Sequence, residues 1–471
     1  MHAAIHDIIE PWRSDLQRSG QTYYLVGGAV RDLALKRPVT DLDLVCRNAP
    51  AAAERLAQNS HLRVVAFGKR PDQRAYRVIC LDDPTRYLDI TTQHGTTIAD
   101  DLKDRDFTIN AMAAEISNDL EPRVIDPLNG MRDLQKKTIR MVHPAAFEMD
   151  PLRILRAFRL AAELGFTLEA QTRAAARRCA AVLSTCAGER IWSELLQILE
   201  CPHSAEWVVK LDAAGALQAV LPEIEAMKRC TQNAHHHLDV WRHSLLVLEN
   251  CERIFKHLPE EFGAAAGYVE DYLGDGRHAA LIKLTALLHD VAKPSARDVS
   301  APEGRITFYD HDRIGAVMVA NITRRLRLSG RQSRLVTTLV AEHLHLLFLA
   351  EPQVLPATRM RLFRKLGKDT IALLILGMAD LRATRGPAAS YDKRHNFCRW
   401  VRETIVNLQT TILPRAQQAP LITGHDLIGL GMSPGPALGA ILAQINKARD
   451  NDQVTTRADA LALARKLLSP K

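Results

Sequence analysis

A pair of glycines, closely followed by a pair of aspartates, constrains the N-terminal part of this chain more than any other feature. The apolar run Tyr24–Val26 ends at Gly27 and Gly28, a pattern typical of a strand that enters a tight turn. Because glycine lacks a Cβ atom, backbone N–H groups there can approach a phosphate closely, and a helix that begins in the turn favours anions at its N-terminus. The sequence therefore predicts a phosphate-binding turn after the first strand.

The two aspartates belong to a second predicted strand. Leu42, Leu44 and Val45 indicate this strand, and because side chains at positions i and i+2 point to the same face, Asp41 and Asp43 project together. Two neighbouring carboxylates beside a phosphate are costly unless a cation lies between them. Mg²⁺ commonly binds one or two carboxylates together with substrate phosphates, so the pattern predicts a magnesium site.

Length and composition are typical of a globular protein. The 471 residues suffice for about three domains of ~150 residues each, and the net charge of +8 favours phosphate-rich partners only mildly. The eight cysteines include no Cys-x-x-Cys pair, and neither a signal peptide nor a run of 18 apolar residues occurs. We therefore expect a reduced, soluble, cytoplasmic protein that does not enter membranes.

The ordered pattern as a whole is more specific than either of its parts. Gly-Gly-x-x-Arg-Asp at 27–32, followed by Asp-x-Asp at 41–43, resembles the nucleotidyltransferase signature of the class II tRNA nucleotidyltransferase and bacterial poly(A) polymerase family. The resemblance implies an enzyme that adds CMP and AMP, from CTP and ATP, to the tRNA 3′ end without a template. It also implies that the glycines and Arg31 hold the triphosphate, while Asp41 and Asp43 bind catalytic Mg²⁺.

Two further segments extend this resemblance. Asp89 lies in another apolar run and is a candidate third catalytic carboxylate for a two-metal site; an ordinary edge-strand aspartate is the alternative. Residues 105–112 resemble the second motif of the family, in which Arg105 meets the triphosphate while Asp106 and Asn110 recognise the ribose. These last two stand four positions apart and would share a face of a helix.

Asp150 and Arg153 are the residues predicted to read the incoming base. They are neighbours on a helical face and resemble the Glu-Asp-x-x-Arg element of the family, with Met149 in the place of the glutamate. Cytosine and adenine both present an amine donor beside a ring-nitrogen acceptor, which suits one acceptor and one donor, whereas uracil and guanine would leave these groups unpaired. Arg156 and Arg159 follow on the same helix and are expected to bind nucleotide.

A second set of residues points to a separate metal site. Its members are His243, His289, Asp290, His311, His343 and Asp380. The adjacent pair His289 and Asp290, with the distant histidines and aspartate, supplies nitrogen and oxygen donors for a divalent metal. The order resembles the HD phosphohydrolase superfamily, in which His311 and His343 fall at the extra ligand positions of two-metal members. This resemblance implies hydrolysis of phosphate esters such as 2′,3′-cyclic phosphates, with the metal and the natural substrate left open.

The predicted fold class is α+β, with a mixed α/β nucleotidyltransferase head followed by helical parts. Strand-like runs occur only before about residue 142, at Tyr24–Val26, Leu42–Val45, Val64–Phe67, Tyr76–Ile79 and Tyr87–Ile90. The predicted domains are a catalytic head (1–143), a base-reading and RNA-binding neck (144–220), an HD-type domain (221–420) and a helical tail (421–471). We expect residues 1–22 to form one amphipathic helix and Gly263–Gly276 to form a loop.

Several alternatives remain within and outside this class of enzyme. The family usually carries a second arginine where this chain has Asp104, and only Ile90–Asp104 separates the third carboxylate from Arg105, which leaves a short flexible loop. A CC-adding enzyme, an A-adding enzyme and a poly(A) polymerase therefore stand beside the full CCA-adding enzyme. A different reading is an HD phosphohydrolase whose head has degenerated into an RNA-binding module. The oligomeric state is open.

Overall fold

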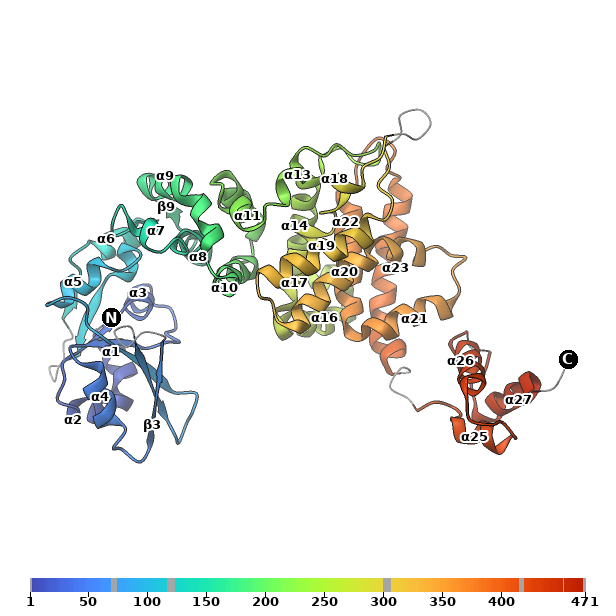
Figure 1. Ribbon diagram of the computed structural model, residues 1–471, viewed down its shortest axis with the longest axis horizontal. Helices are drawn as coiled ribbons and strands as arrows, with labels where there is room; N and C mark the ends of the chain where they lie inside the picture. Colours follow the sequence, from blue (N-terminus) through green and yellow to red (C-terminus); the bar gives the residue numbers. More distant parts are fainter. Residues whose placement is uncertain are drawn as a thin grey trace. The chain divides into compact units, whose positions relative to one another are not determined.

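The computed structural model describes residues 2–68, 74–116, 123–299, 306–414, 419–451 and 453–468. The chain forms two compact units (Figure 1), of which the first holds residues 1–201 and 206–220 and the second holds residues 202–205 and 221–471. The strands lie in the first unit, while the second is helical, so the predicted α+β class is confirmed. No described helix is both long and apolar enough to cross a membrane.

A seven-stranded sheet organises the first unit. Its order is β3-β4-β5-β2-β1-β6-β7. The strands are β1 Tyr23–Val26, β2 Asp43–Cys46, β3 Leu62–Phe67, β4 Ala75–Cys80, β5 Tyr87–Thr92, β6 Ala113–Ile116 and β7 Val124–Ile125. All five strands expected from the sequence form, and neighbouring strands are antiparallel except for the parallel pair β2 and β5.

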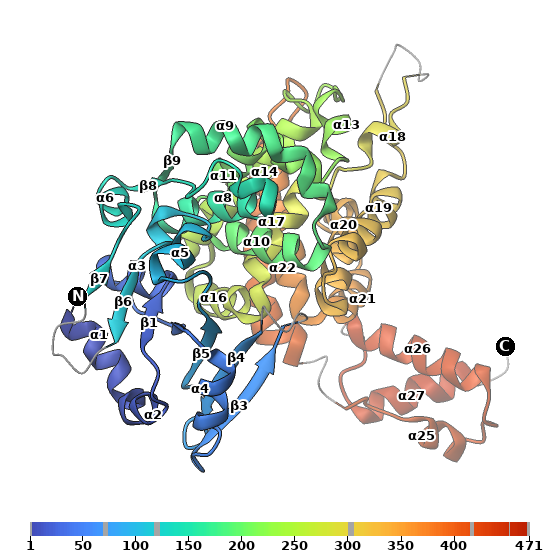
Figure 2. The ribbon, with the colours of Figure 1, turned by 60° about the vertical axis from the view of Figure 1, so that its left-hand side comes forward.

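One face of this sheet is packed and the other is partly open. The helix α4 (Ala49–Leu56), capped by the Asn48 side chain, lies against β3, β4 and β5 (Figure 2). Val78, Leu88 and Ile90 are fully buried beneath it. The alternate residues of the same strands point to the opposite face, which carries the predicted catalytic carboxylates.

The other helices of the first unit connect or follow the strands. They are α3 Gly28–Ala34, α5 Ile98–Lys103, α6 Gly130–Gln135, α7 Ala146–Met149, α8 Arg153–Leu164, α9 Ala170–Cys179, α10 Gly188–Glu200, α11 Ser204–Ala213 and α12 Ala216–Val220. The single helix expected over residues 1–22 is wrong, because the segment divides into α1 (His2–Ile9), a 3₁₀ turn and α2 (Arg13–Arg18). Pro11 lies in that turn and cannot donate a helical hydrogen bond.

Helices pack around α22 in the second unit. Its helices are α13 Ile224–Lys228, α14 Val240–Lys256, α15 Leu258–Phe262, α16 Ala266–Gly274, α17 His278–Leu288, α18 Lys293–Ala296, α19 His311–Arg325, α20 Gly330–Leu349, α21 Pro356–Leu366, α22 Thr370–Ala383, α23 Tyr391–Asn407, α25 Gly424–Gly429, α26 Pro436–Asp450 and α27 Arg457–Leu468. The α22 helix is buried from Thr370 to Ala379 and contacts α14, α17, α20 and α23.

The loop expected at Gly263–Gly276 is wrong, because most of that segment forms α16. Its glycines lie near the ends of the helix, where Gly263 and Gly276 adopt positive φ angles, while Val269, Tyr272 and Leu273 bury one helical face. Tertiary burial of this face therefore decides the helix.

Candidate functional sites

The predicted phosphate turn joins β1 to α3. Gly27 has φ +70°, and a Cβ atom there would lie 3.2 Å from the Arg105 Nη1 atom. Both the backbone conformation and this close approach favour glycine. Arg31, on α3, donates a 2.8 Å hydrogen bond to the Asn110 side chain, so two of the segments singled out in the sequence, 27–32 and 105–112, meet at this turn.

The predicted catalytic carboxylates lie on neighbouring strands. Asp43 of β2 is in register with Asp89 of β5, and two residues earlier Asp41 accepts a 2.6 Å hydrogen bond from the Tyr87 hydroxyl. Asp89 accepts two hydrogen bonds, of 2.9 and 2.8 Å, from the Arg77 guanidinium. The sequence analysis missed Arg77 and Tyr87, which are recognisable only once strand register is known.

The electrostatics of this carboxylate group favour a cation. The Asp43 side chain reaches solvent but is crowded by protein, and this crowding, with the charges of Asp89 and Asp41, raises the pKa of Asp43 despite the opposing effect of Arg105. The oxygen donors suit Mg²⁺. Within the described ranges, however, compact groups of three potential metal ligands, with donor atoms all within 4.8 Å, occur only in the second unit.

The two predicted ribose residues meet, although they do not share an α-helix. Asn110 ends a 3₁₀ turn that begins at Thr108, and its amide donates a 3.1 Å hydrogen bond to Asp106. The expected shared helical face is wrong, because Phe107 is extended and pairs with Met141. The other oxygen of Asp106 lies 3.2 Å from Nε of Arg156.

The predicted base-reading pair does not share a helical face, because Asp150 is extended and only Arg153 belongs to α8, and groups from other segments hold both side chains. Asp150 lies between α7 and α8 and accepts a 2.9 Å hydrogen bond from Arg190, at the start of α10. Arg153 donates hydrogen bonds of 2.8 and 3.4 Å to the backbone carbonyls of Asp104 and Arg105. The main chain at position 104 therefore orients Arg153, whichever side chain stands there.

Arg159 occupies a different environment from the other predicted nucleotide ligands. Its Nε lies 2.7 Å from the Glu194 carboxylate on α10, and its Nη1 lies 3.2 Å from Glu163. Burial raises the pKa of Glu194, although Arg159 and Arg156 oppose this effect. In this structure Arg159 joins α8 to α10, and its contact with nucleotide stays a prediction.

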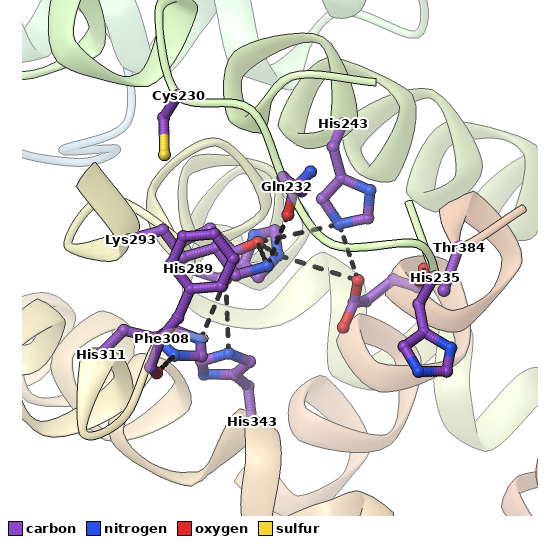
Figure 3. Close-up of polar contacts among 12 residues, drawn as sticks. Cys230, Gln232, His235, His243, His289, Lys293, Phe308, His311, His343 and Thr384 are labelled. Carbon is purple, nitrogen blue, oxygen red and sulfur yellow. Dashed lines mark hydrogen bonds and ion pairs between the residues drawn. The ribbon is translucent and has the colours of Figure 1, made fainter. Parts of the chain in front are cut away.

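The six residues of the predicted second metal site converge from four helices, α14, α19, α20 and α22, and from the turn that follows α17; Figure 3 shows how the histidines that it labels lie. They form two groups, His243 with His289 and Asp380, and Asp290 with His311 and His343, each with donor atoms within 4.8 Å. The Asp290 oxygens link the groups, since one lies 3.3 Å from Nε2 of His311 and the other lies 3.2 Å from Nε2 of His289.

Hydrogen bonds to backbone carbonyls orient three of these imidazoles. Nδ1 of His289, His311 and His343 lies 2.9, 2.7 and 2.7 Å from the backbone oxygens of residues 286, 308 and 340. Each Nδ1 must carry the proton, which leaves a lone pair on Nε2. The three Nε2 atoms are buried and make no hydrogen bond of good geometry. Such unsatisfied nitrogens are costly without a partner, so the donor set fits a bound divalent metal.

A cavity of about 250 Å³ opens onto this cluster. Lys293 lines it, with Nζ 2.6 Å from Asp290 and 2.8 Å from the Gln232 amide oxygen. Although burial alone would raise it, His289 and Lys293 hold the pKa of Asp290 well below its ordinary value. His236, which the sequence analysis missed, also lines the cavity, with its ring edge-on to that of His243 at 4.6 Å.

Three known domain families match consecutive parts of the chain. The Poly A polymerase head domain matches residues 23–140, the domain described as the probable RNA and SrmB- binding site of polymerase A matches residues 165–228, and the HD domain matches residues 240–380. The carboxylates and the predicted triphosphate and ribose residues therefore fall within the first match and the six HD-site residues within the third, while Asp150 and Arg153 lie between the first two matches.

Relatives named as tRNA nucleotidyltransferases or CCA proteins align with 70% to 94% of the chain. An A-adding tRNA nucleotidyltransferase of Deinococcus radiodurans is 31% identical, with 94% of each chain covered. A CC-adding tRNA nucleotidyltransferase of Thermus thermophilus is 30% identical, over 93% of this chain and 92% of the relative. A multifunctional CCA protein of Xanthomonas euvesicatoria is 32% identical, over 70% of this chain and 76% of the relative.

Solved structures share the fold at lower sequence identity. A CCA-adding enzyme (apo form I) superposes with a TM-score of 0.65 at 22% identity, covering 99% of this chain and 94% of the other. The Thermotoga maritima CCA-adding enzyme complexed with tRNA gives a TM-score of 0.64 at 21% identity, covering 98% and 96%.

Proposed function

Because this chain belongs to the tRNA nucleotidyltransferase family of enzymes, we propose that it adds CMP and AMP, from CTP and ATP, to the tRNA 3′ end without a nucleic-acid template. The relatives described above confirm the family resemblance that the motifs predicted. The proposed specificity for C and A rests on one observation: other protein groups hold the base-reading pair in a fixed position. Arg190 and two backbone carbonyls hold Asp150 and Arg153 in place, so that protein groups take the role of a template base.

The predicted site residues of the head each have a defined role in this proposal. Asp41 and Asp43 bind Mg²⁺ with the nucleotide, and Asp89 completes the carboxylate group. When bound, the metal neutralises charge on the triphosphate and favours attack by the RNA 3′ hydroxyl. Arg105, beside Gly27, and Arg31, beside Gly28, hold the triphosphate.

The ribose and the base are recognised by the connected residues that follow. Asp106 accepts a hydrogen bond from a ribose hydroxyl and Asn110 forms one with the other hydroxyl, while Arg156, 3.2 Å from Asp106, orients this carboxylate. Asp150 accepts a hydrogen bond from the exocyclic amine of C or A, while Arg153 donates one to the ring nitrogen. Uracil and guanine would leave both groups unpaired, at a cost of about 1–3 kcal/mol each.

The second unit supplies a separate activity in this proposal. The HD site hydrolyses phosphate esters such as 2′,3′-cyclic phosphates, with a divalent metal of unassigned identity held by its histidines and aspartates. Lys293 lies where it contacts both Asp290 and the cavity, so it is suited to receive a phosphoryl oxygen. The segments 1–143, 144–220, 221–420 and 421–471 act as head, neck, HD-type domain and tail.

The test supplies purified protein and Mg²⁺ with three tRNA transcripts, which end before CCA, after C, or after CC. Each transcript receives labelled CTP, labelled ATP or both, and the products are sized on a gel. Three nucleotides added to the shortest transcript support full CCA addition. Two additions, or A added only after CC, identify a CC-adding or an A-adding enzyme, and a long A ladder identifies a poly(A) polymerase.

No incorporation by the protein on any of the transcripts would overturn the nucleotidyltransferase proposal. Hydrolysis of a 2′,3′-cyclic phosphate without incorporation would instead support the alternative of an HD phosphohydrolase with an RNA-binding head. Both assays therefore use the same preparation, so that an inactive sample is recognised by the loss of both activities.

A further inference from the structure

The row of catalytic carboxylates continues across the sheet to its free edge. Asp43 of β2 pairs in register with Asp89 of β5, Asp89 pairs with Arg77 of β4, and Arg77 pairs with Val65 of β3. Residues directly opposite one another on paired strands point to the same face. At about 4.8 Å per strand, the row therefore spans roughly 14 Å, from the candidate metal ligand to the edge of the sheet.

Side chains on this face of β3 are exposed. Phe67 and Val65 have 43% and 39% of their surface accessible, and Arg63 is also exposed. They alternate with residues that point towards α4. We call Arg63, Val65, Phe67, Arg77 and Tyr87 the edge platform.

The edge platform combines aromatic rings with a guanidinium group. Arg77 lies over the Tyr87 ring, with its central carbon 4.1 Å from the ring centroid, and 5.6 Å from the centroid of Phe67. Its Nε and Nη2 atoms are hydrogen-bonded to Asp89, and the Tyr87 hydroxyl is hydrogen-bonded to Asp41. The platform is therefore held in a fixed position relative to the candidate catalytic carboxylates.

We propose that the edge platform binds the single-stranded 3′-terminal nucleotides of the RNA substrate and directs the terminal hydroxyl towards Asp43 and Asp89. This inference rests on the proposed function. Stacking suits this task because every base has a flat face, and the terminal base changes with each addition. Arg63 complements the phosphate backbone, and continuity with the carboxylates places the occupant where a primer end must arrive.

The test uses a tRNA transcript that lacks CCA and carries 2-aminopurine, a base whose fluorescence falls on stacking, as its last nucleotide. Binding to the wild-type protein quenches the fluorescence. In the Phe67→Ala Arg63→Ala double variant, we expect most of the quenching to disappear and the KM for tRNA to rise about 10-fold, while the KM for CTP stays unchanged. Phe67→Trp keeps the stacking surface and should retain the quenching.

The matched control is Leu81→Ala, which removes a similarly exposed apolar side chain of the head, four residues beyond Arg77, and should behave as the wild type. Unchanged quenching and unchanged KM for tRNA in the double variant would overturn the inference. If only self-association of the protein changes, the surface joins copies of the chain instead, and the inference also fails. A wild type that quenches but incorporates no nucleotide contradicts the proposed function alone.

Discussion

The two candidate metal sites of this protein differ in their exposure to solvent and in the direction in which the pKa of a carboxylate is shifted. In the head, Asp41 and Asp43 reach solvent, and the pKa of Asp43 is raised by crowding and by the neighbouring carboxylates. In the HD site, His289 and Asp290 are each about 1% exposed, and the pKa of Asp290 is lowered by His289 and Lys293 against the effect of burial. In the head, the neighbouring carboxylates repel one another. In the HD site, His289 and Lys293 offset the negative charge of Asp290.

This difference indicates whether each site is suited to a metal that arrives with the substrate or to one that stays bound. The head carboxylates are accessible and lack the compact donor group found in the HD site, so they suit a metal that arrives with a triphosphate and leaves with pyrophosphate. The HD histidines are buried and oriented by backbone carbonyls, so they suit a metal that stays between turnovers. The following predictions test this contrast, beginning with the largest effect.

Separate substitutions should abolish the two activities independently. Asp43→Asn should reduce nucleotide incorporation more than about 100-fold, because a direct ligand should matter more than the outer partners whose loss costs roughly 10–100-fold. Asp290→Asn should reduce phosphate-ester hydrolysis by at least as much. Each variant is measured in both assays, with His345→Ala, a partly exposed histidine of α20, as the control. Loss of both activities in either variant, in a folded protein, would contradict the independence of the sites.

Metal removal should affect the second unit more than the first. When the free metal concentration is 100 times its Kd, binding stabilises the unit that holds the metal by about 2.7 kcal/mol. Dialysis against a chelator should therefore lower the melting temperature of the second unit, measured by calorimetry. Incorporation should return as soon as Mg²⁺ is added with nucleotide. Equal shifts in both units, or none, would remove the distinction between a resident metal and one that comes with substrate.

Loosening the base-reading pair should have a moderate effect confined to the head. Arg190→Ala removes the 2.9 Å hydrogen bond to Asp150, and we expect discrimination of CTP and ATP against UTP and GTP to fall about fivefold, since partly exposed ion pairs are worth up to ~1 kcal/mol. The ratio of kcat/KM values for the four nucleotides measures this change. Arg177→Ala, an exposed arginine of α9, is the control, and an equal loss there would indicate a general effect of charge on RNA binding.

The pH dependence of stability should have opposite signs at the two sites in metal-free protein. Because the pKa of Asp43 is raised on folding, its contribution to stability is present below the ordinary pKa of 3.8 and is lost as the pH rises through the folded value. Asp43→Asn should therefore stabilise the head at neutral pH, with the difference fading towards pH 4. This is the smallest effect that we predict.

The lowered pKa of Asp290 reverses the sign. Its contribution is present above the ordinary pKa and is lost as the pH falls through the lower folded value, so Asp290→Asn should destabilise the second unit at neutral pH. Calorimetric melts of both variants and of the wild type, at several pH values in the presence of a chelator, measure both differences. The same sign for both variants would contradict the electrostatic contrast between the sites.

Local patterns in the sequence determined much of the molecule. Short apolar, strand-like runs located five strands of the head, because such a run is a property of neighbouring residues in the chain. The spacing of Asp41 and Asp43 predicted two neighbouring carboxylates at β2, which in the structure begins at Asp43, and the adjacent His289 and Asp290 pointed to the second group of potential metal ligands. These features depend on neighbours in the chain, so they can be recognised before the fold is known. The division of the chain into four domains stays a prediction.

The tertiary structure alone decided which distant residues meet. Parallel pairing of β2 with β5 brings Asp43 beside Asp89, and the packing of α8 on α10 brings Arg190 to Asp150; neither contact follows from spacing. Tertiary burial likewise turned most of Gly263–Gly276 into α16, and helix packing brought the six HD residues together. The physical reason is that strand order, helix packing and desolvation arise from contacts between segments, and a local pattern records only what each segment can bury.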